Sequence, residues 1–184
     1  VGQDTSIRIF DVADPRRPRL LGGSVLPMVA QRAAMRWPHL IVVGSAQHES
    51  PRRSGRIGGD GRMLVLDVSD PAAPTIAGEL GGLWSPSSVA VAGDKAFVAD
   101  AERGVRIVDL ADPGLPRARA EIGDVTNAID VDVVGSHALV VDERAGMAVF
   151  DLTDLDAPLR VGFLPLQHGS ESTGEIEDPY AMYA

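Results

Sequence analysis

Short runs of apolar residues recur along the chain between turns rich in glycine, proline and aspartate. The runs lack the alternation of apolar and polar residues that marks a strand with one wet face, so they are typical of strands buried on both faces of a sheet. No stretch shows a helical period of 3.6 residues, and 13 prolines and 20 glycines disfavour long helices. The pattern predicts an all-β fold. The clearest runs are LIVV (40–43), MLVL (63–66), AFVA (96–99), ALVV (138–141) and MAVF (147–150).

The runs belong to an internal repeat. Four segments share a strand that ends in aspartate and a second aspartate three positions later: IRIFDVADPRRP (7–18), MLVLDVSDPAAP (63–74), VRIVDLADPGLP (105–116) and MAVFDLTDLDAP (147–158). The strand-ending residues Asp11, Asp67, Asp109 and Asp151 lie 56, 42 and 42 residues apart. KAFVAD (95–100) and HALVVD (137–142) keep the same spacing of 42. The unit therefore has about 42 residues, and the second unit carries extra residues between Gly44 and Gly61.

Each unit divides into four short strands, which in the third unit are 88–92, 96–99, 105–108 and 117–122. Gly93 suits the two-residue turn of a hairpin, and Gly104 can supply the positive φ that a longer link requires. Four antiparallel strands per unit, buried on both faces, predict a blade of a β-propeller packed between its neighbours. A β-sandwich would instead show alternation along each strand.

The predicted organisation is a run of propeller repeats over 1–164 followed by a C-terminal tail at 165–184. The blades are expected at 1–25 (partial), 26–80, 81–122 and 123–164, with an insert loop at 45–60. The first unit has only its outer pair of strands. The tail contains no segment that resembles the inner pair of the third unit, VAVAGDKAFVAD (89–100). We therefore expect an incomplete ring, whose missing strands come from sequence before Val1, from another chain or from a further segment.

The stretch FVADAERGVRIVDLADPGLP (97–116) resembles the LVIVP repeat, a propeller-forming unit of bacterial and archaeal proteins that are mostly exported or attached to the cell surface. The resemblance covers roughly residues 7 to 164. The fourth unit departs from it, with Asp154-Leu155 where the others have Asp-Pro. The resemblance implies a propeller and an exported location, periplasmic or at the cell surface. It implies no particular reaction, because one propeller can host many functions.

Composition removes several classes of function. The net charge of −9 makes nucleic acid a poor partner, since binding phosphates needs a basic face. No apolar run approaches the ~20 residues that span a bilayer, so no direct membrane span is expected. There is no cysteine for a disulfide or a thiolate metal site. The chain begins at Val1 without the features of a signal peptide, which means either that processing removed one or that this sequence starts partway through a longer chain.

The repeated aspartates are the first candidates for a ligand-binding or catalytic role. Paired carboxylates could bind Ca²⁺, which takes six to eight oxygen ligands. Aspartate also accepts hydrogen bonds from nearby backbone N–H groups in turns, and a role repeated in every unit favours this structural interpretation. The four histidines have no metal-ligand spacing, and there is no nucleophile motif or phosphate loop. We therefore predict no catalytic residue, no metal site and no cofactor.

Partner-binding residues are predicted where the repeat is broken. The insert carries Arg52, Arg53 and Arg56, which suit contacts with carboxylates or phosphates, although a mobile solvated loop is the alternative. Trp84 is either an interface anchor or a cap on the junction between blades. Tyr180 and Tyr183 in the tail could anchor it on a partner, although such tails are commonly disordered. Trp37 is expected to pack within its own blade.

In a meander of four strands, the links between strands two and three share one edge of the propeller with the links between blades. The sequence therefore predicts a non-catalytic interaction or structural module that presents this loop-rich face to a protein partner, in a larger assembly or at the cell surface. One alternative is a ligand-binding or enzymatic propeller with a site in the central channel, where Asp130 and Asp132 are the candidate carboxylates. Another is a propeller stabilised by calcium.

Overall fold

The computed structural model describes residues 5–46 and 59–166. These residues form fourteen strands, and the described ranges contain no helix. The all-β prediction is confirmed. The strands are β1 (Ser6–Asp11), β2 (Arg19–Val25), β3 (Met28–Arg36), β4 (His39–Ala46), β5 (Gly61–Asp67), β6 (Thr75–Leu83), β7 (Ser88–Ala92), β8 (Lys95–Ala99), β9 (Val105–Asp109), β10 (Arg117–Ile122), β11 (Ala128–Val134), β12 (His137–Asp142), β13 (Gly146–Asp151) and β14 (Leu159–Pro165).

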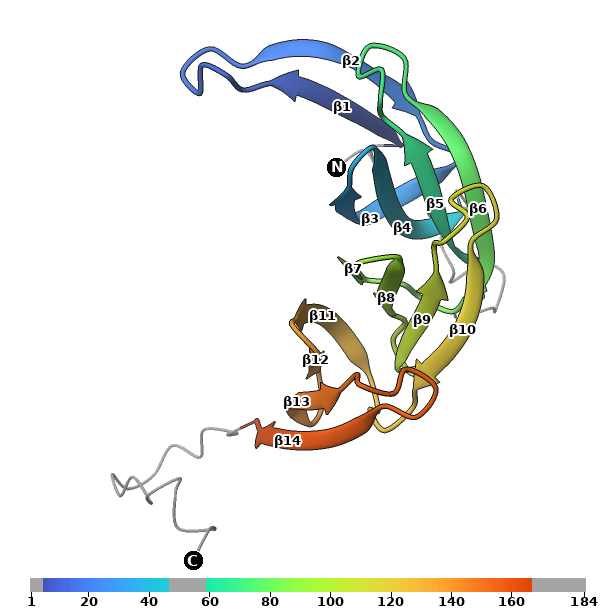
Figure 1. Cartoon of the computed structure of the whole chain (residues 1–184), viewed down its shortest axis with the longest axis vertical. Coiled ribbons are helices and arrows are strands. Elements are labelled where there is room, and N and C mark those ends of the chain that lie inside the picture. Colours follow the sequence, from blue (N-terminus) through green and yellow to red (C-terminus); the bar gives the residue numbers. More distant parts are fainter. Residues whose placement is uncertain (1–4, 47–58, 167–184) are drawn as a thin grey trace, which may run out of the picture.

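The strands form four antiparallel sheets in chain order. We name them the half blade (β1–β2), the second blade (β3–β6), the third blade (β7–β10) and the fourth blade (β11–β14). They follow one another along an open arc, with β3, β7 and β11 on its concave side and β6, β10 and β14 on its convex side (Figure 1). The half blade and the fourth blade lie at opposite ends of the arc, so the ring is not closed, as the sequence predicts.

An apolar layer fills the space between each pair of neighbouring sheets. On β8, Phe97 and Ala99 pack toward the fourth blade, whereas Ala96 and Val98 pack in the layer against the second blade. All four side chains are buried, which explains why residues 96–99 of this strand are apolar without interruption. Stacking of blades thus supplies the core, and each sheet depends on its neighbours.

The predicted turn residues have the expected backbone geometry. Gly93 has a φ of 59° in the two-residue turn between Ala92 and Lys95, which are paired in register. Gly104 has a φ of 72°, and a Cβ atom at this position would lie 2.1 Å from the carbonyl oxygen of Ile122. The positive φ favours glycine at both turns, and at Gly104 the close carbonyl oxygen also leaves no space for a side chain.

Some details differ from the sequence-based expectations. Trp37 is 72% exposed, so the prediction that it packs within its own blade is wrong. It stands in the two-residue turn between β3 and β4, at the repeat position of Gly93 in the third blade, and a residue in such a turn lies outside the packed strands. The predicted insert loop begins later than residue 45, because Ser45 pairs with Gly61 in the β4–β5 ladder.

Candidate functional sites

The repeated Asp-Pro turns use their carboxylates to hold the backbone. Each strand-ending aspartate accepts the N–H of the residue two positions later, at 2.8 to 2.9 Å. The second aspartate of each turn does the same, at 2.9 to 3.1 Å. This is the arrangement that the structural interpretation of the repeat predicts. The bonds from Ser69 and Ala111 also lower the pKa values of Asp67 and Asp109, because the charged carboxylate is the better acceptor.

These turns also pack on the preceding blade. A Cβ atom on Gly22 of β2 would lie 2.5 Å from the carbonyl oxygen of Pro71, and one on Gly78 of β6 would lie 2.3 Å from that of Pro113. The two contacts are equivalent in the repeat, since Gly78 follows Gly22 by 56 residues and Pro113 follows Pro71 by 42. The turn edge therefore stabilises the stack of blades, and its carboxylates already have backbone partners.

The opposite edge carries the longer links, and we name it the link face: residues 26–27, 84–87, 100–104, 123–127 and 143–145. Hydrogen bonds confirm that links between blades lie beside links within blades, as the topology predicts. The N–H groups of Trp84 and Ser85 donate to the side chain of Asp100, and Glu143 N–H donates to the carbonyl oxygen of Asn127.

Asp142 lies at the centre of the link between the third and fourth blades. It is 2% exposed and accepts the N–H groups of Thr126 and Asn127 from that link. The N–H groups of Arg144 and Ala145, from its own turn, donate to it at 2.8 and 3.0 Å, and the Thr126 hydroxyl donates as well. Burial alone would raise the pKa of Asp142, but these donors lower it to about 2. Asp142 is therefore an ionised structural residue.

Asp100 occupies the same repeat position one blade earlier, and it is fully buried. The Trp84 N–H lies 2.7 and 2.9 Å from its two carboxylate oxygens, and the Ser85 N–H lies 2.8 Å from one of them. Burial outweighs these bonds and raises the pKa of Asp100 above its ordinary value. The sequence does not distinguish Asp100 from Asp142, because both residues end the second strand of a blade.

Trp84 is half-buried at the junction between the second and third blades. Its indole N–H donates to Glu102 at 3.0 Å, and the guanidinium of Arg103 lies 5.5 Å from the ring centroid. Its carbonyl oxygen accepts the N–H of Gly59 at 2.8 Å. The structure therefore brings Trp84 together with the within-blade link and the end of the insert. This supports the junction cap, and it also makes Trp84 part of the link face.

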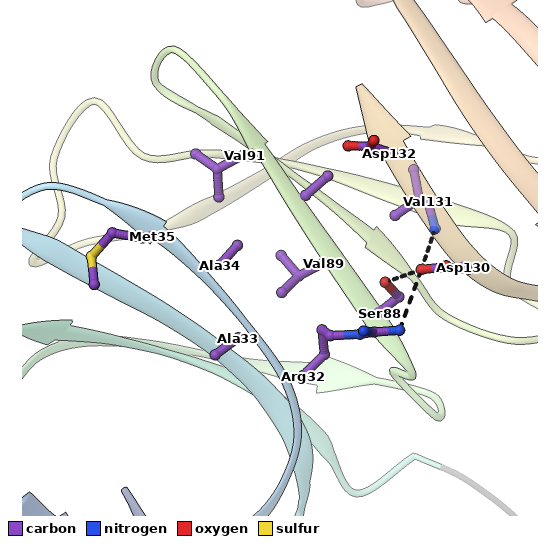
Figure 2. Close-up of a pocket in the computed structure, with 11 residues that line it drawn as sticks. Arg32, Ala33, Ala34, Met35, Ser88, Val89, Val91, Asp130, Val131 and Asp132 are labelled. Atoms are coloured by element: carbon purple, nitrogen blue, oxygen red, sulfur yellow. Dashed lines mark hydrogen bonds and ion pairs between the residues drawn. The ribbon is translucent and has the colours of Figure 1, made fainter. Parts of the chain in front are cut away.

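The concave side of the arc carries a second candidate site. Arg32 of β3, Ser88 of β7 and Asp130 of β11 occupy the same repeat position, since they lie 56 and 42 residues apart. The Ser88 hydroxyl donates to Asp130, and Arg32 Nη2 lies 3.7 Å from Asp130 Oδ1 (Figure 2). Beside this row is an open hollow of about 380 Å³ lined by the three inner strands. Asp130 is among the residues predicted from the sequence, whereas Arg32 and Ser88 are not, although the spacing of the repeat could have identified them.

The charge of Asp130 is already balanced by Arg32, and its Oδ1 atom also accepts the N–H of Val131. The carboxylate of Asp132 is exposed and accepts the N–H of Val133 at 2.8 Å. Over residues 5–46 and 59–166, no group of three or more histidine and carboxylate side chains is placed to hold a metal ion. A central-channel ligand site remains a prediction from the sequence.

The other predicted partner-binding residues lie outside the described residues. These are Arg52, Arg53 and Arg56 of the insert and Tyr180 and Tyr183 of the tail. Of the six residues predicted from the sequence, only Trp84 can be placed.

The stacked four-stranded sheets define an open β-propeller built from repeats. In particular, a family model described as LVIVD repeat matches residues 57–80 and 85–119. The chain thus contains LVIVD repeats, which confirms the family resemblance. No curated protein matches this sequence. The described part of the chain has no helix with the length and apolarity needed to cross a membrane.

Proposed function

We propose that this propeller is a non-catalytic interaction module whose link face binds a protein partner, in a larger assembly or at the cell surface. The exported location follows from the family resemblance alone. The mechanism is rigid presentation, in which stacked sheets fix the positions of loops whose side chains are free to differ.

One observation supports the proposal most strongly: the aspartates that hold each link recur from unit to unit, whereas the residues of the links differ. Asp100 and Asp142 are equivalent, and each holds the link from the preceding blade. The positions around them differ, with Trp84 in one unit and Thr126 in the next. Glu102 is likewise replaced by Arg144, and both of these side chains are exposed. At the turn edge, by contrast, the paired aspartates and their bonds recur in every unit.

Site-specific photo-crosslinking in cells of the source organism would test this proposal. A photoreactive phenylalanine analogue would replace Glu102 or Arg144 on the link face, with Ala111 on the turn edge as the matched exposed control. We expect a discrete protein adduct from the link-face positions and none from Ala111. The additional change Arg103→Ala should weaken the adduct from Glu102, since it alters the surface around Trp84.

An adduct from Ala111 alone would assign the partner to the turn edge and contradict the proposal. The absence of any protein adduct from both link-face positions, with the protein correctly located and folded, would also contradict it.

A further inference from the structure

The two ends of the arc expose repeat positions that are buried everywhere else. We name the face of a sheet toward the preceding blade its back face, and the face toward the following blade its front face. Phe10 in the half blade is 47% exposed and Val12 is 63% exposed. The residues equivalent to these two in the other blades lie on back faces and are at most 8% exposed: Leu66, Val108 and Phe150 for Phe10, and Val68, Leu110 and Leu152 for Val12.

The fourth blade shows the same feature on its front face. Met147 and Val149 of β13 are half-buried. Their equivalents, Met63 and Val65 in the second blade and Val105 and Ile107 in the third, are at most 1% exposed. Leu164 of β14, which is paired in register with Met147 and therefore lies on the same face, is 60% exposed. The front face of the fourth blade thus has the apolar surface that covers a following blade elsewhere.

Front and back faces are complementary throughout the arc. The front of the second blade packs on the back of the third, and the front of the third packs on the back of the fourth. The exposed front of the fourth blade and the exposed back of the half blade are therefore surfaces of matching type. They cannot meet within one chain, because they lie at opposite ends of the arc (Figure 1).

The innermost strand indicates which kind of blade fits the front of the fourth blade. Ala34 and Ala90 occupy one front-face position in the second and third blades, and Asp132 occupies it in the fourth. A complete blade on this face would bury the Asp132 carboxylate against another inner strand, which is costly for an unpaired charge. In the half blade the described residues pair no inner strand with β1. Strands β1 and β2 alone would therefore cover the apolar outer strands and leave Asp132 in water.

Charge also favours contact between the two ends. The half blade over residues 5–27 has four arginines and two aspartates, a net charge of +2. The fourth blade over residues 123–166 has eight carboxylates and two arginines, a net charge of −6. Opposite net charges favour encounter between these ends and oppose contact between two fourth blades.

We propose that the front face of the fourth blade binds the back face of the half blade of a second copy of this chain. The interface is heterologous, so two copies can close into a ring or further copies can extend the series. The residues at its centre are Phe10 and Val12 on one side and Met147, Val149 and Leu164 on the other. This proposal is independent of the link-face partner, because it uses the ends of the arc.

Light scattering coupled to size-exclusion chromatography would measure the mass of the chain at tens of micromolar concentration. We expect a particle of at least twice the 19.4 kDa of one chain. Phe10→Asp and Val149→Asp should each abolish association. Leu115→Asp, at a 51% exposed apolar position in a turn, is the matched control and should associate like the unchanged protein. Circular dichroism checks the folding of each variant, and Val12→Asp and Leu164→Asp replace any variant that fails to fold.

Mixing the Phe10→Asp and Val149→Asp variants provides the decisive measurement. Each variant keeps one intact end, so a head-to-tail interface predicts that the mixture forms pairs of one chain of each kind. A monomeric unchanged protein would overturn the proposal. Association that survives Val149→Asp but not Phe10→Asp would also overturn it, because the interface would then join two half blades. Loss of association in Leu115→Asp would contradict it as well.

Discussion

Asp100 and Asp142 occupy the same position of the repeat, but their chemical states differ. Both end the second strand of a blade, both are buried, and both hold the link that arrives from the preceding blade. The pKa of Asp142 is lowered to about 2, whereas the pKa of Asp100 is raised. Burial raises the pKa of both carboxyls, but the carboxyl of Asp100 is the more deeply desolvated and also has the smaller number of hydrogen-bond donors.

The turn that follows each aspartate determines this number. After Asp142, the N–H groups of Arg144 and Ala145 point back to the carboxylate. After Asp100, Ala101 has a φ of 51° and forms a β-bridge with Ala128 of the next blade. The Arg103 N–H then donates to the backbone oxygen of Asp100 and not to its side chain. Contact with the following blade thus removes donors from Asp100, and a repeated motif does not guarantee a repeated electrostatic environment.

The largest expected effect comes from removing the better-bonded carboxylate. Asp142→Ala leaves four backbone N–H groups and the Thr126 hydroxyl without their acceptor, and we expect a loss of about 3 kcal/mol in the free energy of unfolding. Asp100→Ala should cost only about 1 kcal/mol, because fewer donors lose their acceptor and the cost of burying the carboxyl is removed with it. Urea denaturation of both variants measures the two values. Equal losses would contradict the proposed role of the turn donors.

The pH dependence of stability should separate the two aspartates. Because the folded pKa of Asp142 is depressed from 3.8 to about 2, its contribution of about 2 kcal/mol is fully present above pH 3.8 and is lost as the pH falls toward 2. Asp100 has the opposite sign. Its folded pKa is raised, so it opposes folding increasingly as the pH rises from 3.8 through the folded value.

Denaturation measured across this pH range in Asp142→Asn and Asp100→Asn would check both signs. We expect Asp142→Asn to reduce the acid loss of stability and Asp100→Asn to reduce the decline at higher pH. An acid loss that is unchanged in Asp142→Asn would show that other carboxylates cause it.

The smallest expected effect concerns the backbone of Ala101. Its positive φ is unfavourable for a residue with a side chain, and Ala101→Gly removes this cost while adding entropy to the unfolded chain. We expect a net gain of up to about 1 kcal/mol in the free energy of unfolding. Glu143→Gly at the equivalent position of the fourth blade is the matched control and should destabilise, because Glu143 has no positive φ to relieve. Thermal melts of the two variants should therefore shift in opposite directions.

The sequence alone determined the class of fold because the repeat constrains local structure strongly. Continuous apolar runs such as 96–99 require burial on both faces, and this requirement is met by stacking of blades. Gly93 and Gly104 indicate turns in the sequence, because glycine adopts a positive φ without the steric cost that a side chain would add. The paired aspartates predict their own turns, since each bonds to an N–H only two positions away.

What the sequence could not determine depends on contacts between residues far apart in the chain. Trp37 is a large apolar residue that the sequence predicts to be packed, but it lies in the turn between β3 and β4 and is 72% exposed. The row of Arg32, Ser88 and Asp130 exists because three inner strands converge on the concave side of the arc. The opposite pKa shifts of Asp100 and Asp142 depend on how deeply each carboxyl is buried and on the donors that its turn and link provide. Local propensity fixes strands and turns, whereas charge states and exposed surfaces are set by the neighbours that only the tertiary structure supplies.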